Sequence, residues 1–411
     1  MKEGTTTIIA GGTRMEQSVL DTKKELVEKA RSLIPKLREY GEEIEKTNSL
    51  PKAIIDDLQN EGTLKVLRPH LFGGYQTDMR TYTEVVTEIS RGNGSAGWFV
   101  ALSNIRDYMI SYTFGEKALS EIYKKGEDVV LAGNFKPIKC DIKKVDGGYY
   151  IEEAQWPFVS GSPHADWCYF GFPIFDENGG VEMAIMVIPR NELEVLDDWY
   201  VMGLKGSGSN SCHIKNVFVP DHRVSLDRLA SKGEYLIEPL KEVALYSSSF
   251  VPSLTLSIVA PALGLAKAAM DLFMERLPKA GIGNTFYNKQ AEAPITHHQV
   301  AQAQLKIDSA EMHLYRAVDK IDSYAARGQV MDKNEIIKVK ADFGYVNQLC
   351  KEAIDLLVAG VGSMFTYETN PIQRVYRDFL TMHLHGFITP TSLIETYGRV
   401  LCGQEPNTYF V

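Results

Sequence analysis

The segment QWPFVSGSPHADW, residues 155–167, brings together side chains that could do chemistry. It holds two of the four tryptophans of the chain, two small hydroxyls at Ser160 and Ser162, and an imidazole and a carboxylate at His164 and Asp166. The surrounding pattern predicts a strand, on which alternation would place His164 and Asp166 on the same face. They could form an acid–base pair, but we interpret them as structural or as a contact to a ring edge. Ser-Gly-Ser alone is typical of a turn.

Two other stretches carry imidazole groups. His385 lies in HLHGF, and an imidazole with an ordinary pKa near ~6.5 can accept a proton at neutral pH. On a helix, His383 would point away from His385. The alternative for His385 is a helix-end histidine that bonds to a carbonyl. His297 and His298 are adjacent at a predicted helix start, where capping or surface exposure is more typical than metal binding, so we expect no metal site.

The glycine- and serine-rich stretch GLKGSGSNS, residues 203–211, lies between two predicted strands. It lacks the G-x-G-x-x-G spacing and the following helix of a dinucleotide-binding turn. A plain β-turn explains it nearly as well as a binding loop does.

Composition limits the class of protein. The chain has 411 residues, of which 44% are hydrophobic, enough for two or three packed units. Its net charge of -9 argues against nucleic acid and anionic membranes as main partners. From the sequence we expect no apolar stretch that approaches the ~18 residues of a membrane span, and the N-terminus lacks a long apolar region. Five scattered cysteines without a CxxC pair fit reduced thiols, so we expect a cytoplasmic protein.

The hydrophobic period divides the chain into blocks. Residues 1–18 suggest a loose tail, and residues 19–126 follow a helical pattern. The period changes to alternation over residues 127–234, with turns at DGG and ENGG, which predicts a small β sandwich. Residues 235–411 return to long helical patterns, which predict a helix bundle.

This order and several motifs resemble the acyl-CoA dehydrogenase superfamily. The stretch from LPKAIIDDLQNEG to GNGSAGW resembles the N-terminal helical signature of that superfamily. LVAGVGSMF followed by NPIQRVYRD resembles its late glycine-rich turn and the Arg-Asp helix after it. The resemblance covers residues 20–405. It implies an α+β fold with an N-terminal α-helical domain, a central small β sandwich or barrel, and a C-terminal four-helix bundle.

Within that superfamily the chain is most similar to the flavin-dependent monooxygenases, the oxygenase components of two-component aromatic hydroxylases of the p-hydroxyphenylacetate hydroxylase type. GSAGWF, WPFVSGSPHADW, WYVMGLKGSGSNSCHIKNVFVPDHRV and HLHGF followed by YGRVLCG carry this likeness. A dehydrogenase needs a catalytic Glu near the C-terminus, but Thr389 falls at about that place and Glu395 is one to two helical turns further on. Without a carboxylate base, proton abstraction from an acyl thioester has no agent.

The resemblance implies how these residues act. Aromatic side chains beside a flavin ring would exclude water, and a small hydroxyl would bond to its N5 edge without crowding the C4a carbon that takes up dioxygen. Ser160 is the first choice for the N5 contact and Ser162 the second. His385 would accept a phenol proton or hold a phenolate, so that the ring attacks a C4a-hydroperoxyflavin. The predicted flavin contacts are Trp156, Phe158, Ser160, Ser162, Ser207, Ser209, Asn210 and Arg377, and the predicted substrate contacts are Trp98, Ser95 and His385.

One departure from the superfamily bears on the cofactor and the partners. Where dehydrogenases place an Arg that reaches the FAD pyrophosphate of the neighbouring subunit, NKQAEAP has Asn288. Loss of that charge-assisted contact fits a protein that takes reduced flavin, FMNH2 or FADH2, from a separate NAD(P)H–flavin reductase, with dioxygen as co-substrate. The fold implies a homotetramer in which C-terminal helices complete neighbouring flavin sites.

The sequence therefore predicts a reduced-flavin-dependent monooxygenase that hydroxylates a small phenol- or indole-like substrate. Three alternatives stay open. They are an N-oxygenase of an amine such as an amino sugar, a true acyl-CoA dehydrogenase, and a catalytically inactive helical scaffold.

Overall fold

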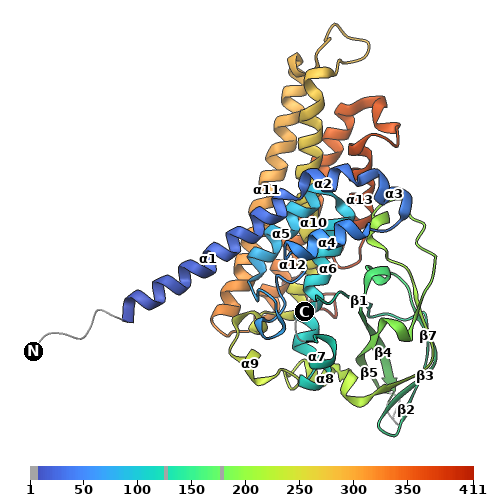
Figure 1. The fold of residues 1–411 in the computed structure, drawn as a ribbon. Helices are drawn as coiled ribbons and strands as arrows, with labels where there is room; N and C mark the ends of the chain where they lie inside the picture. Colours follow the sequence, from blue (N-terminus) through green and yellow to red (C-terminus); the bar gives the residue numbers. More distant parts are fainter. Residues whose placement is uncertain (1–7, 125–127, 176–179) are drawn as a thin grey trace, which may run out of the picture.

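The computed structural model describes residues 8–124, 128–175 and 180–411, with side chains from Leu20 on. The chain forms a helical domain, a β sandwich and a helix bundle in that order (Figure 1). The first domain consists of α1 (Ile8–Ser32), α2 (Ile34–Glu39), α3 (Gly41–Thr47), α4 (Lys52–Asn60), α5 (Met79–Gly92), α6 (Gly94–Thr113) and α7 (Glu116–Ile122). Residues 8–18, for which the sequence suggests a loose tail, already belong to α1; residues 1–7 lie outside the described residues.

Helix α6 is the central element of the helical domain. Asn93 caps it, because its side chain accepts the backbone N–H of Ala96 at 3.1 Å. Most of its residues are buried, on every side of the helix, as expected for a helix that is apolar all round. A helix buried in this way can carry polar side chains only where they have partners, so its few polar residues mark functional or structural contacts.

Two four-stranded sheets form the sandwich. Their strand orders are β1–β4–β5–β8 and β2–β3–β7–β6. The inner faces meet in an apolar core that contains Ile151, Phe170 and Ile214, which confirms the predicted small sandwich. The strands are β1 (Leu131–Asn134), β2 (Lys139–Val145), β3 (Gly148–Trp156), β4 (Trp167–Phe175), β5 (Val181–Pro189), β6 (Glu194–Val195), β7 (Cys212–Pro220) and β8 (Val224–Leu226).

The strand predicted across residues 155–167 is interrupted. β3 ends at Trp156 and β4 begins at Trp167, with a 3₁₀ turn over Ser162–His164 between them. Gly161 has a φ of +82°, a left-handed conformation that glycine adopts without a Cβ clash, so the chain can reverse there. The serines of this segment therefore lie on a connection at the end of the sandwich.

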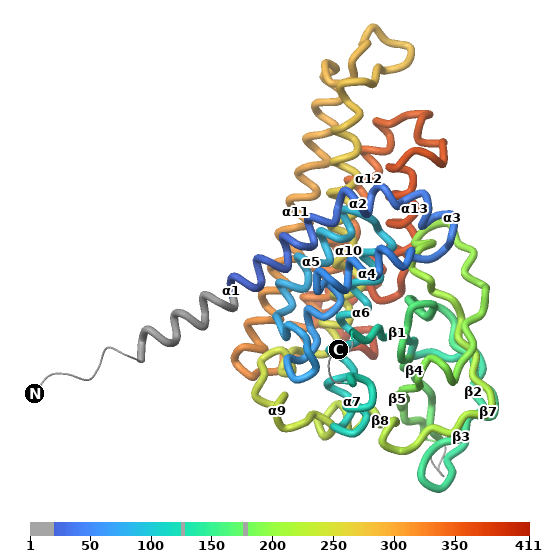
Figure 2. The backbone as a smooth tube through the Cα atoms, in the orientation of Figure 1, coloured from blue at the N-terminus to red at the C-terminus, as the bar shows by residue number. Residues whose placement is uncertain are grey.

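The last block contains α8 (Asp227–Ala230), α9 (Glu238–Lys241), α10 (Phe250–Arg276), α11 (Pro294–Ala326), α12 (Lys333–Val361), α13 (Pro371–His383) and α14 (Pro390–Leu401). In Figure 1, α11 and α12 run side by side and the bundle extends beyond the other two domains. Figure 2 shows the chain between β6 and β7 rising from the sandwich towards α3 and α13. This long connection carries residues 203–211.

One segment in the described part of the chain, Phe250–Lys279, is long and apolar enough to cross a membrane. Its 30 residues correct the expectation that no apolar stretch approaches the length of a span. In the structure, 83% of its most apolar window is buried inside the protein. Since α10 packs against α5, α6 and α12, this composition is that of the core helix of a bundle.

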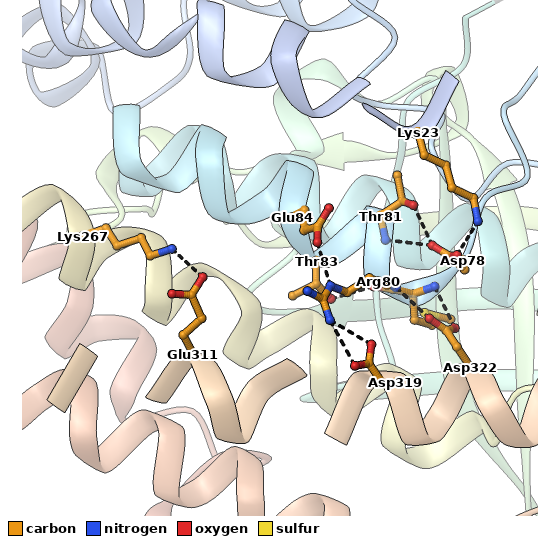
Figure 3. Close-up of polar contacts among 11 residues, drawn as sticks. Lys23, Asp78, Arg80, Thr81, Thr83, Glu84, Lys267, Glu311, Asp319 and Asp322 are labelled. Atoms are coloured by element: carbon orange, nitrogen blue, oxygen red, sulfur yellow. Dashed lines mark hydrogen bonds and ion pairs between the residues drawn. The ribbon is translucent and has the colours of Figure 1, made fainter. Parts of the chain in front are cut away.

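Charged side chains fix α5 to α11 (Figure 3). The carboxylate of Asp322 accepts the backbone N–H groups of Met79 at 3.0 Å and Arg80 at 2.9 Å, at the first turn of α5, where unpaired N–H groups favour an anion. Burial raises the pKa of Asp322 to about 7. The guanidinium of Arg80 pairs with Asp319 at 2.9 Å. Figure 3 also draws the ion pairs Lys23–Asp78, Arg80–Glu84 and Lys267–Glu311.

Candidate functional site

A chain of hydrogen-bonded side chains links the helical domain to the end of the sandwich. The indole Nε1 of Trp98, on α6, donates to Ser160 Oγ at 3.1 Å. Ser160 Oγ lies 2.7 Å from Ser209 Oγ, which in turn lies 2.7 Å from Ser207 Oγ. All four side chains are buried. Three of the predicted flavin contacts and one predicted substrate contact therefore meet at one place.

The hydroxyl of Ser160 keeps one position free. A hydroxyl has one hydrogen and two acceptor lone pairs. Ser160 Oγ accepts from Trp98 and shares one bond with Ser209. If Ser160 donates that bond, a lone pair remains; if Ser209 donates it, the hydrogen of Ser160 remains. The same atom can therefore meet either a donor or an acceptor on a ligand.

The loop that carries Ser207 and Ser209 is fixed from three sides. The N–H of Leu204 donates to Asp378 Oδ1, on α13, at 2.6 Å. The indole of Trp199 donates to the carbonyl of Leu204 at 3.2 Å. Ser95 Oγ, on α6, accepts the N–H of Gly206 at 3.1 Å and so holds the loop, while its predicted contact with the substrate stays a prediction.

Two glycines allow the loop to lie this close to its neighbours. A Cβ at position 203 would lie 2.1 Å from the carbonyl oxygen of Arg377, and one at position 206 would lie 2.1 Å from Ile44 Cγ2. Neither distance is tolerated by real side chains. The glycines of GLKGSGSNS are therefore explained by close backbone packing, and its serines by the hydroxyl chain.

His385 lies in the turn after α13, beside Trp98. The two ring centroids are 6.0 Å apart and the rings are tilted by 56°. His385 Nδ1 accepts the backbone N–H of Phe387 at 3.2 Å, so the proton of a neutral ring lies on Nε2. Burial lowers the pKa of His385, which favours this neutral form. Nε2 has no hydrogen-bond partner among the described residues, which leaves an N–H available to a ligand.

His383, the last residue of α13, has a different surrounding. Its Nδ1 lies 3.1 Å from Asn347 Oδ1, and its ring stacks on Phe379 with centroids 5.7 Å apart. His383 therefore contacts α12 and its own helix, whereas His385 contacts Trp98.

The two aromatic residues predicted to contact flavin are placed differently. Trp156 is completely buried; its ring stacks on Phe170 at 4.4 Å and its Nε1 donates to the carbonyl of Gly171. It packs the sandwich core, so the structure does not support its predicted contact with a ligand ring. Phe158 has 66% of its surface exposed and meets the ring of Trp199 edge-on at 6.0 Å. Of the two, only Phe158 has a face open to a ligand.

Asn210 and Ser162 hold the loop ends together. Asn210 Nδ2 donates to the carbonyl of Leu196 at 2.7 Å. Ser162 Oγ is buried and lies 3.4 Å from the carbonyl of Gly208, a weak bond at that length. Ser162 is thus a poorer candidate than Ser160 for a ligand contact.

The guanidinium of Arg377 is already engaged. It pairs with Glu45 of α3 and donates to the carbonyl of Met202 and to Gln373 Oε1. Within this chain Arg377 therefore ties α13 to the helical domain and to the loop before Gly203, and its predicted contact with flavin stays a prediction.

No carboxylate takes the place of the dehydrogenase base in the described part of the chain near His385. Thr389 is the N-cap of α14, and its hydroxyl lies 3.4 Å from the carbonyl of His385. Glu395 points towards Arg399 at 3.7 Å, and half of its side chain is exposed. Neither residue can serve as a buried general base.

His164 and Asp166 do not form an acid–base pair. His164 lies in a 3₁₀ turn rather than a strand, and its Nε2 is 2.9 Å from Ser49 Oγ. Asp166 Oδ2 accepts the N–H of Val130 at 2.8 Å. They bond to different elements, in keeping with a structural role. His297 is exposed and bonds to the carbonyl of Ala291.

A separate cavity of about 620 Å³ opens between the end of α10 and the start of α13. Arg276, Lys279 and Asn370 are among its lining residues, and none of the site serines is. Asn288 is exposed on the neighbouring loop. The two cations place positive charge near the position where Asn288 replaces the expected Arg.

The sequence did not predict the roles of Asp378 and Trp199, which both bond to the backbone of Leu204. Asp378 is distant from Leu204 in sequence, so no local pattern connects them. Burial raises the pKa of Asp378 to about 7. The sequence analysis also did not name Arg106, a charged residue of the largely apolar α6 that donates to the carbonyl of Ser160. For Arg106 a signal existed: the pair Arg106–Asp107 interrupts a long apolar helix.

Comparisons with known proteins agree with this arrangement. Residues 21–124 match the model of the acyl-CoA dehydrogenase N-terminal domain, and residues 256–390 match that of the acyl-CoA dehydrogenase C-terminal domain. The chain is 28% identical, over 89% of its length and 95% of the relative, to oxygenase subunit HsaA of a flavin-dependent monooxygenase from Rhodococcus jostii. It is also 28% identical to an indole-3-acetate monooxygenase from Acinetobacter baumannii, over 86% of this chain and 87% of that one.

The solved structure of XiaF from Streptomyces sp., in complex with FADH2 and glycerol, superimposes with a TM-score of 0.89 at 26% identity. The match covers 97% of this chain and 100% of XiaF. The predicted superfamily, its fold and the likeness to flavin-dependent monooxygenases are thereby confirmed.

Proposed function

The chain belongs to the acyl-CoA dehydrogenase superfamily, and on that premise we propose that it is the oxygenase component of a two-component flavin monooxygenase. Its reaction is the hydroxylation of a small aromatic substrate, phenol- or indole-like. The observation that carries the proposal is the hydroxyl chain Trp98–Ser160–Ser209–Ser207 with the free Nε2–H of His385 next to it.

The residues at this place suit a flavin ring. Ser160 offers one free donor or acceptor position, which matches N5 of a flavin in either redox state. Phe158 offers an exposed ring face, and flat rings pack well against aromatic side chains. Gly206 and Gly208 let the loop that carries Ser207 and Ser209 pack closely against Ile44 and Pro163. When bound, reduced flavin would supply activated dioxygen, through the C4a-hydroperoxyflavin that the resemblance implies.

His385 holds the substrate. Because Nδ1 accepts the N–H of Phe387, Nε2 acts as a donor and can bond to a phenolate oxygen. A phenolate is more electron-rich than the phenol and attacks an electrophilic oxygen more readily. Of the two roles considered for His385, holding a phenolate therefore fits the structure better than accepting a phenol proton. Trp98 lies between His385 and Ser160 and lines the space that the substrate would share with the flavin.

The cofactor is FMNH2 or FADH2, delivered by a separate NAD(P)H–flavin reductase, and dioxygen is the co-substrate. The assembly is a homotetramer, and the protein is cytoplasmic. Exposed apolar side chains on α11, Leu305 and Met312, support assembly through the bundle.

The structure favours a dehydrogenase less, because neither Thr389 nor Glu395 can act as a general base beside His385. An N-oxygenase of an amine would use the same serines but would not need a phenolate-holding histidine. The experiment below separates a dehydrogenase from an oxygenase, whereas the yield of hydroxylated product in His385→Ala separates an N-oxygenase from a phenol hydroxylase.

Stopped-flow absorbance tests the proposal. The protein is mixed anaerobically with reduced FMN or reduced FAD and then with dioxygen. We expect an oxygenated flavin species that forms before oxidised flavin appears and lives longer than in buffer. If flavin reoxidises at the same rate with and without the protein, the proposal is wrong. If the protein instead reduces an artificial electron acceptor with acyl-CoA, it is a dehydrogenase.

A further inference from the structure

Arg106 is a buried cation without a carboxylate partner. It lies on α6, about two turns after Trp98, and 3% of its surface is exposed. Its Nη1 donates to the carbonyl of Leu131 at 2.8 Å and to the carbonyl of Ser160 at 2.9 Å. Its buried Nε has no hydrogen-bond partner in the described part of the chain. No carboxylate among the described residues lies within 4.0 Å of its nitrogen atoms.

The other deeply buried arginine next to it differs in this respect. Arg68 Nε pairs with Asp107 at 3.0 Å, and Tyr123 also donates to Asp107. Asp107 follows Arg106 directly in sequence, but its carboxylate is used by Arg68 on another face of α6. The guanidinium of Arg106 is thus left without a carboxylate, and the aromatic ring of Tyr169, whose centroid lies 6.0 Å from Arg106 Cζ, balances only part of its charge.

Such a charge is costly unless something balances it. An ion removed from water loses its hydration, and two carbonyl oxygens restore only part of it. The carbonyl of Ser160 connects Arg106 to the residue whose hydroxyl we assign to the flavin N5 edge. A positive charge at this place favours whichever form of the bound ligand is negative.

We propose that Arg106 is the fixed counter-charge that makes this site prefer reduced over oxidised flavin. The inference rests on the proposed function and adds a residue to it. Oxidised flavin has a neutral ring; two electrons and one proton, supplied by the reductase, convert it to a ring protonated at N5 and negative at N1. The negative ring is attracted to Arg106 and the neutral ring is not. The attraction acts inside the protein, where salt screens it weakly.

The alternative is that Arg106 only holds the chain at Ser160 in place. A structural role depends on its hydrogen bonds, whereas the proposed role depends on its charge. Two variants separate them: Arg106→Gln keeps N–H donors but is neutral, and Arg106→Lys keeps the charge on a different shape. Circular dichroism and thermal melts establish that each variant is folded.

The experiment compares dissociation constants for oxidised FMN and for anaerobically reduced FMN, and repeats the comparison with FAD. We expect the parent to bind the reduced form more tightly. In Arg106→Gln that preference should fall by about tenfold, equivalent to a shift of about 30 mV in the two-electron midpoint potential of bound flavin. Arg106→Lys should keep most of the preference.

Other outcomes overturn the inference. If Arg106→Gln weakens both redox forms equally, Arg106 is structural. If the parent binds both forms alike, no counter-charge acts on flavin, although a flavin enzyme would still stand; this measurement needs no variant to fold. If the parent binds neither form, the proposed function itself fails, and the inference fails with it.

Discussion

His385 illustrates how one hydrogen bond selects a chemical role. The N–H of Phe387 occupies Nδ1, so the neutral ring presents a hydrogen at Nε2 and no free lone pair. A group with that arrangement stabilises an anionic oxygen and is a poor proton acceptor. Burial lowers the pKa of His385 from its ordinary value near ~6.5, so the ring is neutral at physiological pH and the donor geometry holds there.

The first prediction concerns His385 in the oxygen-transfer step. In His385→Ala the flavin species should still form, but hydrogen peroxide should be released and hydroxylated product should fall by about 10²-fold, the usual scale for removing one hydrogen-bond donor that stabilises an oxyanion. His385→Gln should recover part of the yield, since a carboxamide N–H can replace Nε2–H. Product yield in a single turnover measures both.

His383→Ala is the control for this prediction, because His383 contacts Asn347 and Phe379 instead of the site. It should keep nearly full yield. Equal yields for His385→Ala and the parent would make His385 structural and would favour an amine-oxidising enzyme. If His385→Gln loses as much hydroxylated product as His385→Ala, a hydrogen-bond donor is not sufficient and His385 acts as a general base.

The second prediction concerns Ser160. Ser160→Ala removes the hydroxyl that joins Trp98 to Ser209 and that we propose as the contact to flavin N5. Losing one such bond should cost about 1–2 kcal/mol, so the oxygenated flavin should decay roughly tenfold faster while the protein stays folded. Stopped-flow decay rates and a thermal melt provide the measurement. An unchanged decay rate in a folded variant would transfer the role to the serines of residues 207–209.

At the scale of elements, the serine loop depends on backbone contact with α13. The third prediction is that Gly203→Ala displaces this loop, because the added Cβ would meet the carbonyl oxygen of Arg377 at 2.1 Å and backbone cannot yield easily. The free energy of unfolding should fall by about 1–3 kcal/mol, the usual cost of overpacking, and flavin affinity should fall with it. Urea unfolding and flavin titration measure the two effects.

Gly398→Ala provides a matched control for that variant. Gly398 lies within α14, and a Cβ there would meet nothing within 4 Å. Alanine favours a helix over glycine, so this variant should be slightly more stable and bind flavin normally. If Gly203→Ala behaved like Gly398→Ala, the close contact with α13 would have no role in holding the loop.

The hydrophobic pattern of the sequence predicted most of the helices and strands, but it did not predict which of them contact one another. The change from helical period to alternation near residue 128 predicted the sandwich, because side-chain period is a local property. The break after Trp156 escaped prediction, since Ser-Gly-Ser is compatible with a strand end or a turn. The sequence predicted Trp156 as a flavin contact, but its ring faces the sandwich core against Phe170, a contact that depends on the packing of the opposite sheet.

The candidate site was predictable in the same limited way. The hydroxyls at 160, 207 and 209 could be named from the motifs, yet their common hydrogen-bond chain depends on two loops that meet in space. Asp378 belongs to the motif NPIQRVYRD, but only its bond to the N–H of Leu204 shows that it holds the loop. Long-range contacts of this kind leave no periodic signal in one sequence.

At the scale of the whole molecule, the bundle extends beyond the domains that hold the serines (Figure 1). Helix α11 has 33 residues, about 50 Å of helix, and exposes Leu305 and Met312, seven residues apart on one face. Exposed apolar side chains aligned along a helix are typical of contact with another protein surface. If the protein forms the tetramer proposed above, we expect its contact on this face of the bundle.

The fourth prediction follows from that placement. Light scattering after size exclusion should give about four times the 46.0 kDa of one chain. Leu305→Glu combined with Met312→Glu would bury two carboxylates in the interface, so the mass should fall, and flavin affinity should fall too if neighbouring bundles complete each site. Ile138→Glu is the control: Ile138 is 66% exposed, close to the 65% of Leu305, but it lies next to β2 in the sandwich. If the tetramer persists in the double variant but dissociates in Ile138→Glu, the interface lies on the sandwich and not on α11.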